Sequence, residues 1–169
     1  KLIKKYEDET LDVINENPYL MTRSVKGFSF ANADLLAKAI GIKGDSPFRI
    51  EAAFRQVLAS HSGETGDTYM LAGKLVPETY QLLVNSRPEE EQLITNELLK
   101  NLLDEFIEDR RFYCDFDNAD SNKNKIFLYS SYMNEFKIVE NVIRIMDSEG
   151  YISSSADIDS IIDEVEEEV

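Results

Sequence analysis

Residues 24–42 read SVKGFSFANADLLAKAIGI, and this stretch decides the fold expected for the first part of the chain. Ser29 is a good N-cap for a helix from about residue 30 to residue 40, and Gly41 ends that helix. The apolar residues of this helix share one face: Phe30, Ala33, Leu36, Ala37 and Ile40. Gly27 interrupts the helical pattern between this helix and a shorter one over 18–24. The stretch therefore predicts two helices joined by a tight glycine turn.

The segments on either side of this hairpin are also mainly helical in pattern. Upstream of Pro18 the sequence indicates the end of one helix and a short second helix. Downstream, Asp45 or Ser46 caps a helix that starts at Pro47 and runs to about residue 61, with Ile50, Phe54, Val57 and Leu58 on its buried face. A loop over 62–68 precedes further expected elements: helices over 75–84 and 91–108, short strands over 110–116 and 125–131, and a helix over 131–147.

The composition is that of a folded protein with a strongly uneven charge. The chain has 169 residues, of which 43% are hydrophobic and 10% aromatic, which is enough for a real core. The formal net charge is −15. Residues 1–60 hold nine Lys/Arg and eight Asp/Glu, whereas residues 61–169 hold nine basic and twenty-five acidic residues. The first part, being nearly neutral, could still present a local phosphate site, because backbone dipoles need no net charge.

Several kinds of site and segment are not expected in this sequence. With one cysteine, Cys114, and one histidine, His61, it has neither an internal disulfide nor the ligands of a typical zinc site. No catalytic or metal-binding residue is expected. No run of about 18 apolar residues and no signal peptide is visible, so we expect a cytoplasmic protein without a membrane segment. Because the chain starts at Lys1 within a helical pattern, we also expect it to be a fragment of a longer protein.

Four blocks follow one another in the order that one known family shows. They are ETLDVINENPYLM (9–21), VKGFSFANADLLAKAIGI (25–42), DSPFRIEAAFRQVL (45–58) and TYM (68–70). They resemble the region ahead of the motor in RecD-like ATP-dependent DNA helicases, the RecD/TraA group, to which the alpha subunit of exodeoxyribonuclease V belongs. The resemblance covers about residues 1–145 and is most specific over residues 17–58.

The resemblance implies a helix-hairpin-helix, in which backbone N–H groups of the turn and of the second helix face a DNA phosphate. The implied DNA-binding residues, acting mostly through the backbone, are Lys26, Gly27, Phe28, Ser29 and Phe30. Ala33 matches the small residue that lets the two helices pack closely. Ser29 stands where the family carries a second glycine, and a serine can cap the helix and donate its hydroxyl hydrogen to a phosphate. A phosphate contact carries no base information, so the implied binding is independent of sequence.

The resemblance also implies the organisation of the chain. The fold class expected is mainly α: a helix-hairpin-helix region over 1–64 with its first hairpin element truncated, then a winged-helix-like unit over 65–149 with a two-stranded β wing. An acidic tail or linker over 150–169 would lead toward an ATPase core.

The function implied is that of a non-catalytic DNA-binding accessory module of a helicase that acts in DNA unwinding, recombination or repair. No G-x-x-x-x-G-K-[ST] occurs in the sequence, so ATP and magnesium are expected in the parent helicase and no cofactor in this fragment. The expected partners are DNA and the parent's own ATPase core. The alternative is a docking or spacer module of the same helicase that binds no DNA.

Overall fold

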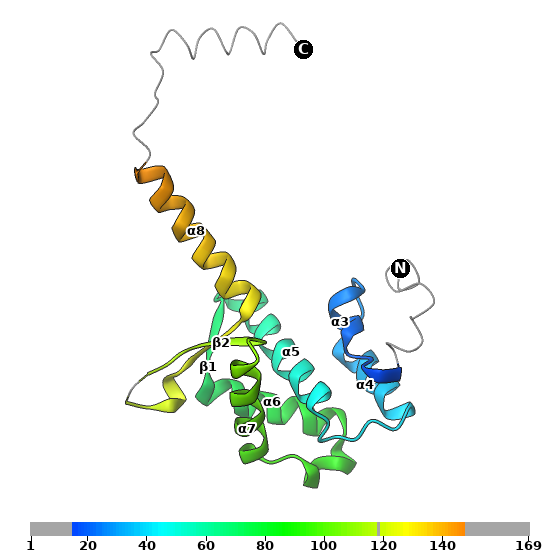
Figure 1. Ribbon diagram of the computed structural model, residues 1–169. Coiled ribbons are helices and arrows are strands. Elements are labelled where there is room, and N and C mark those ends of the chain that lie inside the picture. The colour runs from blue at the N-terminus through cyan, green and yellow to red at the C-terminus, as the bar shows by residue number, and fades with distance from the viewer. Residues whose placement is uncertain (1–14, 118, 148–169) are drawn as a thin grey trace, which may run out of the picture. The chain divides into compact units, whose positions relative to one another are not determined.

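The computed structural model describes residues 15–117 and 119–147. Within these residues the chain is mainly α-helical, as the sequence predicts, with one small antiparallel sheet (Figure 1). The helices expected within residues 1–14 and the acidic tail over 150–169 lie outside the described residues. The elements are α3 (Leu20–Ser24), α4 (Phe30–Ala39), α5 (Pro47–Thr65), β1 (Tyr69–Leu71), α6 (Ala72–Ser86), the 3-10 helix η2 (Pro88–Leu93), α7 (Asn96–Glu108), β2 (Phe112–Asp115), the 3-10 helix η3 (Ser121–Lys123), β3 (Lys125–Leu128) and α8 (Tyr129–Asp147).

Most helix ends lie where the local sequence places them. Ser29 is the N-cap of α4, and Thr95 is the N-cap of α7; each side chain accepts a hydrogen bond from the backbone three residues later. Gly41 has a φ of +86°, the left-handed conformation that stops α4. Helix α5 is longer than expected, because it continues through residues 62–65 and ends only at Gly66, whose φ is +81°.

The sheet differs from the expected wing, which was predicted with two strands and has three. The strand order is β1-β3-β2, and both pairs are antiparallel. In the register Tyr69 lies opposite Phe127, which in turn lies opposite Tyr113. β1 is only three residues long, so it carries almost no local signal and depends on its pairing with β3. With β1 included, the order of the main elements from α5 to β3 is helix, strand, two helices and two strands. The winged-helix-like unit expected over 65–149 stays a prediction.

The core lies where α5, α6 and α7 meet the sheet. In Figure 1 the α3–α4 hairpin lies on one side of α5, and α6 and α7 lie on the other. Phe54 of α5 is fully buried and meets the ring of Phe112 edge-on, at 6.1 Å between centroids. Leu75, Leu83 and Leu99 are also almost completely buried. Helix α5 is thus shared by the hairpin and by the helix–sheet unit, and it fixes where the hairpin lies.

The chain divides into two compact units, residues 1–132 and 133–169. In the second unit the described part of α8 buries none of its side chains. Its exposed apolar residues include Phe136, Val139, Ile143 and Met146, which are 46–77% exposed and follow one another at helical spacing. No helix among the described residues is both long and apolar enough to cross a membrane.

Removing the ring of Phe54 tests the shared core. We expect Phe54→Ala to lower the free energy of unfolding by about 3–5 kcal/mol, because the substitution leaves a cavity between α5 and β2. Urea denaturation followed by circular dichroism measures this loss. Leu35→Ala is the control, since Leu35 is 69% exposed and its loss should cost about 0.5 kcal/mol or less. Equal losses in the two variants would contradict a core centred on Phe54.

Candidate functional site

The turn between α3 and α4 is a tight turn built around one glycine. The Phe28 N–H donates to the Val25 carbonyl at 3.1 Å, which closes a four-residue turn with Gly27 at its third position. Gly27 has a φ of +84°, the conformation that this position needs in a type II turn. A Cβ added at Gly27 would meet no atom within 4 Å. Glycine is therefore required by the backbone angle, and the space in front of the turn is open.

The side chains of the expected site divide into exposed and buried ones. Lys26, Gly27 and Ser29 are exposed, and Phe28 is half-buried against the core. Phe30 is 4% exposed and stacks on Tyr19, with ring centroids 5.8 Å apart. Phe30 can therefore face a ligand only through its backbone. Ala33, expected to let the helices pack, is completely buried.

Ser29 needs no glycine-like conformation. Its φ of −80° and ψ of 161° are ordinary extended values, and its side chain accepts from the Asn32 N–H at 3.3 Å. The serine that replaces the family's second glycine is thus compatible with the turn. Its hydroxyl acts as a helix cap and still carries one hydrogen that can be donated.

The turn presents a group of backbone donors. Within the described part of the chain, the N–H groups of Gly27, Ser29, Phe30 and Ala31 donate no hydrogen bond, whereas the Ala33 N–H donates to the Ser29 carbonyl at 3.1 Å. The first N–H groups of any helix lack partners within the helix, and the helix dipole adds partial positive charge there. The turn therefore has the chemistry of an anion-binding site.

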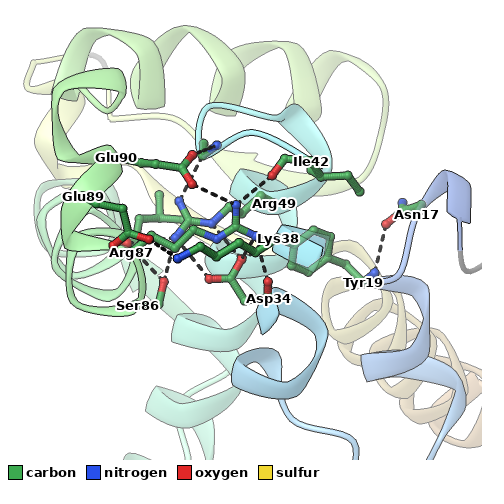
Figure 2. A network of polar contacts seen from close by, with 12 residues as sticks. Asn17, Tyr19, Asp34, Lys38, Ile42, Arg49, Ser86, Arg87, Glu89 and Glu90 are labelled. Carbon is green, nitrogen blue, oxygen red and sulfur yellow. Dashed lines mark hydrogen bonds and ion pairs between the residues drawn. The ribbon is translucent and has the colours of Figure 1, made fainter. Parts of the chain in front are cut away.

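A buried carboxylate holds this hairpin in place. Asp34 is 3% exposed and accepts from the Tyr19 hydroxyl at 2.6 Å, which joins the start of α3 to α4. It accepts two hydrogen bonds from Arg49 of α5, at 2.9 and 3.2 Å. It also forms an ion pair with Arg87, just after α6, at 2.8 Å. Figure 2 shows the guanidinium groups of Arg49 and Arg87 side by side above Asp34.

The two arginines also hold the backbone around the hairpin. Arg49 donates to the carbonyls of Gly44 and Leu83 at 3.0 and 2.9 Å. Arg87 donates to the carbonyls of Ile42 and Asp34, both at 2.8 Å. Each charged group inside the protein thus meets an opposite charge or several oxygen atoms, as burial of a charge requires. The hairpin, the loop over 41–46 and the end of α6 are joined in one network (Figure 2).

Neighbouring charges determine the ionisation of this network. Burial by itself raises the pKa of Asp34, but the hydrogen bonds from Arg49 and Tyr19 and the charge of Arg87 outweigh it, so the pKa lies below its usual range. Burial raises the pKa of the Tyr19 hydroxyl, and the Asp34 carboxylate raises it further. At neutral pH Asp34 is therefore charged, and Tyr19 is a neutral donor.

A second cluster lies at the other side of α5. Glu51 meets three arginines: Arg23 at 3.8 Å, Arg55 at 2.8 Å and Arg111 at 2.9 Å. Burial raises the pKa of Glu51, but the hydrogen bonds from Arg55 and Arg111 lower it more, so this carboxylate stays charged. Arg111 also pairs with Asp109 at 2.8 Å. Arginines from α3, from α5 and from the residue just before β2 thus meet at one buried glutamate.

The site residues expected from the sequence do not include Asp34, Arg49 or Arg87. A signal was present for the first, because Asp34 lies four residues after Phe30 and so on the apolar face of its helix. A charged residue on a buried face needs a buried partner. The identity of those partners depends on long-range packing, and no local pattern indicates Arg87, which lies 53 residues further along the chain.

Residues 1–69 match the family model of the helix-hairpin-helix domain of ATP-dependent RecD2 DNA helicases. The matched residues include the hairpin, the buried Asp34 and Arg49, and all of α5. The resemblance found in the sequence is therefore confirmed over this part of the chain.

Neutralising Asp34 tests the network. We expect Asp34→Asn to lower the free energy of unfolding by about 3–5 kcal/mol at pH 7, because Arg49 and Arg87 lose their shared counter-charge. The folded pKa of Asp34 lies below that of the unfolded chain, so its contribution is complete above about pH 5 and is lost as the pH falls through the folded pKa. The difference in free energy of unfolding between wild type and Asp34→Asn, measured by urea denaturation, should therefore become smaller as the pH falls.

Lys38→Gln is the control for this measurement. It removes the ion pair with Glu89, in which both side chains are about half exposed, so it should change stability by about 1 kcal/mol or less. A gap between wild type and Asp34→Asn that stays constant from pH 7 to pH 3 would contradict the assigned ionisation.

Proposed function

We propose that this chain is a non-catalytic DNA-binding module of a RecD-like helicase, because residues 1–69 match the family model of the helix-hairpin-helix domain of RecD2 helicases. Its hairpin, residues 25–31, holds one phosphate of the DNA backbone without regard to sequence. The observation that carries the proposal is the group of unpaired N–H donors at Gly27, Ser29, Phe30 and Ala31 beside an open approach at Gly27.

The contact needs little from side chains. A phosphate in front of Gly27 would accept from the backbone N–H groups and gain from the partial charge at the start of α4. The exposed Lys26 would add a charge beside it, and the Ser29 hydroxyl could donate its hydrogen. The buried Asp34 network would hold the donors in one orientation, so that few conformations are lost on binding.

The acidic residues of the helix–sheet unit support the hairpin as the contact point. Helix α7 exposes Glu97, Asp104, Glu105 and Glu108, and only one cation, Lys100, so it would repel a phosphate backbone. DNA would therefore approach from the side of α3, α4 and the first turns of α5.

The rest of the activity would belong to the parent enzyme. ATP and magnesium would bind to its ATPase core, which would also be the partner of this module within the same chain. DNA unwinding in recombination or repair would place the enzyme in the cytoplasm. The module would contribute affinity and position for DNA, and the motor would contribute the chemistry.

Changing Gly27 tests the hairpin. We expect Gly27→Val to weaken binding to a labelled duplex by about ten-fold or more, because a β-branched residue does not adopt a φ of +84° and the turn must change. Fluorescence anisotropy at fixed salt measures this loss. Gly66→Val is a matched control, since Gly66 has a φ of +81° and equally open space but lies at the far end of α5. Equal affinity of Gly27→Val and Gly66→Val for the duplex would contradict the proposal.

Salt dependence tests the contribution of Lys26. Each phosphate contact made by a cation releases counterions, so Lys26→Gln should reduce the slope of log affinity against log salt by about one. Lys26→Gln should lower the affinity equally for duplexes of unrelated sequence. The matched control is Lys74→Gln, an exposed lysine on α6, which should leave the slope unchanged. An unchanged slope for Lys26→Gln would place that side chain away from the phosphate.

A further inference from the structure

A groove of about 360 Å³ opens beside the hairpin within the first compact unit. Three parts of the chain form its walls: the hairpin with Arg23 and Phe28, the outer side of α5 with Arg55 and Ala59, and the end of β3 with Leu128. The groove joins the hairpin to the sheet, and its volume lies within the range of about 300–1,000 Å³ that ligand pockets have.

The lining of the groove combines apolar walls with positive charge. It contains two arginines and no carboxylate, although the chain as a whole has 33 acidic and 18 basic residues. The side chains of Arg23 and Arg55 are 48% and 22% exposed, so they reach solvent while pairing with Glu51 underneath. Arg111 shares that same glutamate and also pairs with Asp109.

We infer that this groove binds an unpaired nucleotide of a single DNA strand, next to the phosphate held by the hairpin. The inference rests on the proposed function and deepens it. The base would lie against Phe28 and Leu128, and its phosphate would meet Arg23 and Arg55. The bases of a duplex are stacked and paired, so only an unpaired base can enter the groove. The module would thus recognise a junction, with duplex or single strand at the hairpin and an unpaired base beside it.

Charge complementarity identifies the occupant. A partner protein would have to bring an acidic apolar segment, whereas a nucleic-acid strand carries an apolar base and an anionic phosphate in every unit. The same unit fits both halves of the groove, and the strand that supplies it already lies at the adjacent hairpin under the proposed function.

The test uses the whole chain and places one negative charge in its groove. Ala59 is exposed on α5 and lines the groove, so Ala59→Glu keeps the helix and repels a phosphate. Gln56→Glu places the same charge at a neighbouring lining position with almost no change in shape. Ser60→Glu is the matched control, because Ser60 is also exposed on α5 but does not line the groove. Circular dichroism checks that all three variants fold.

The probes are labelled oligothymidylate and a blunt duplex in fluorescence anisotropy. We expect Ala59→Glu and Gln56→Glu to weaken binding of the single strand about five-fold or more and binding of the duplex less than about two-fold, with Ser60→Glu like wild type. The groove assignment is overturned if both groove variants bind oligothymidylate as wild type does. It is also overturned if they lose affinity equally for the single strand and the duplex. Duplex binding that is insensitive to Gly27→Val overturns the hairpin proposal instead, so the two failures are distinguishable.

Discussion

The position of the hairpin depends on one buried carboxylate shared by two arginines. Asp34 alone would be unstable in the interior, and Arg49 and Arg87 would be equally unstable without it. Together they connect α4, α5 and the end of α6. Because guanidinium and carboxylate groups meet in fixed directions, the pairing also fixes the angle of the hairpin. The unpaired N–H groups of the turn are therefore presented in one orientation.

Features with a local cause could be predicted from the sequence. Ser29 caps α4 and Gly41 ends it because both effects involve residues within one turn of the helix. The buried face of α5 follows from the spacing of Ile50 and Phe54. The glycine turn at Gly27 could also be predicted, because its signal lies in the neighbouring residues. The family match over residues 1–69 agrees with it.

Features with a distant cause could not be predicted. The strand β1 exists because Tyr69–Leu71 pairs with β3, more than fifty residues later, so three residues of sequence carried no strand pattern. Ile40, just after α4, shares the apolar face predicted for this helix but is 38% exposed, while Asp34 is buried among the apolar residues. The charge cluster around Glu51 draws on three separate segments. Sequence spacing describes each helix by itself and does not show which helices will meet.

The contacts from Arg49 and Arg87 to backbone carbonyls also have a mechanical consequence. Under the proposed function, a DNA strand pulled by the motor of the parent enzyme would exert force on the turn at Gly27. Along the chain that force would pass through the ten residues of α4, a loop, the whole of α5 and β1 before it reached α6. The side-chain bridge from Asp34 to Arg87 crosses the same distance in a single ion pair of 2.8 Å. The hairpin and the end of α6 would therefore share such a force through this bridge, and not only through the backbone between them.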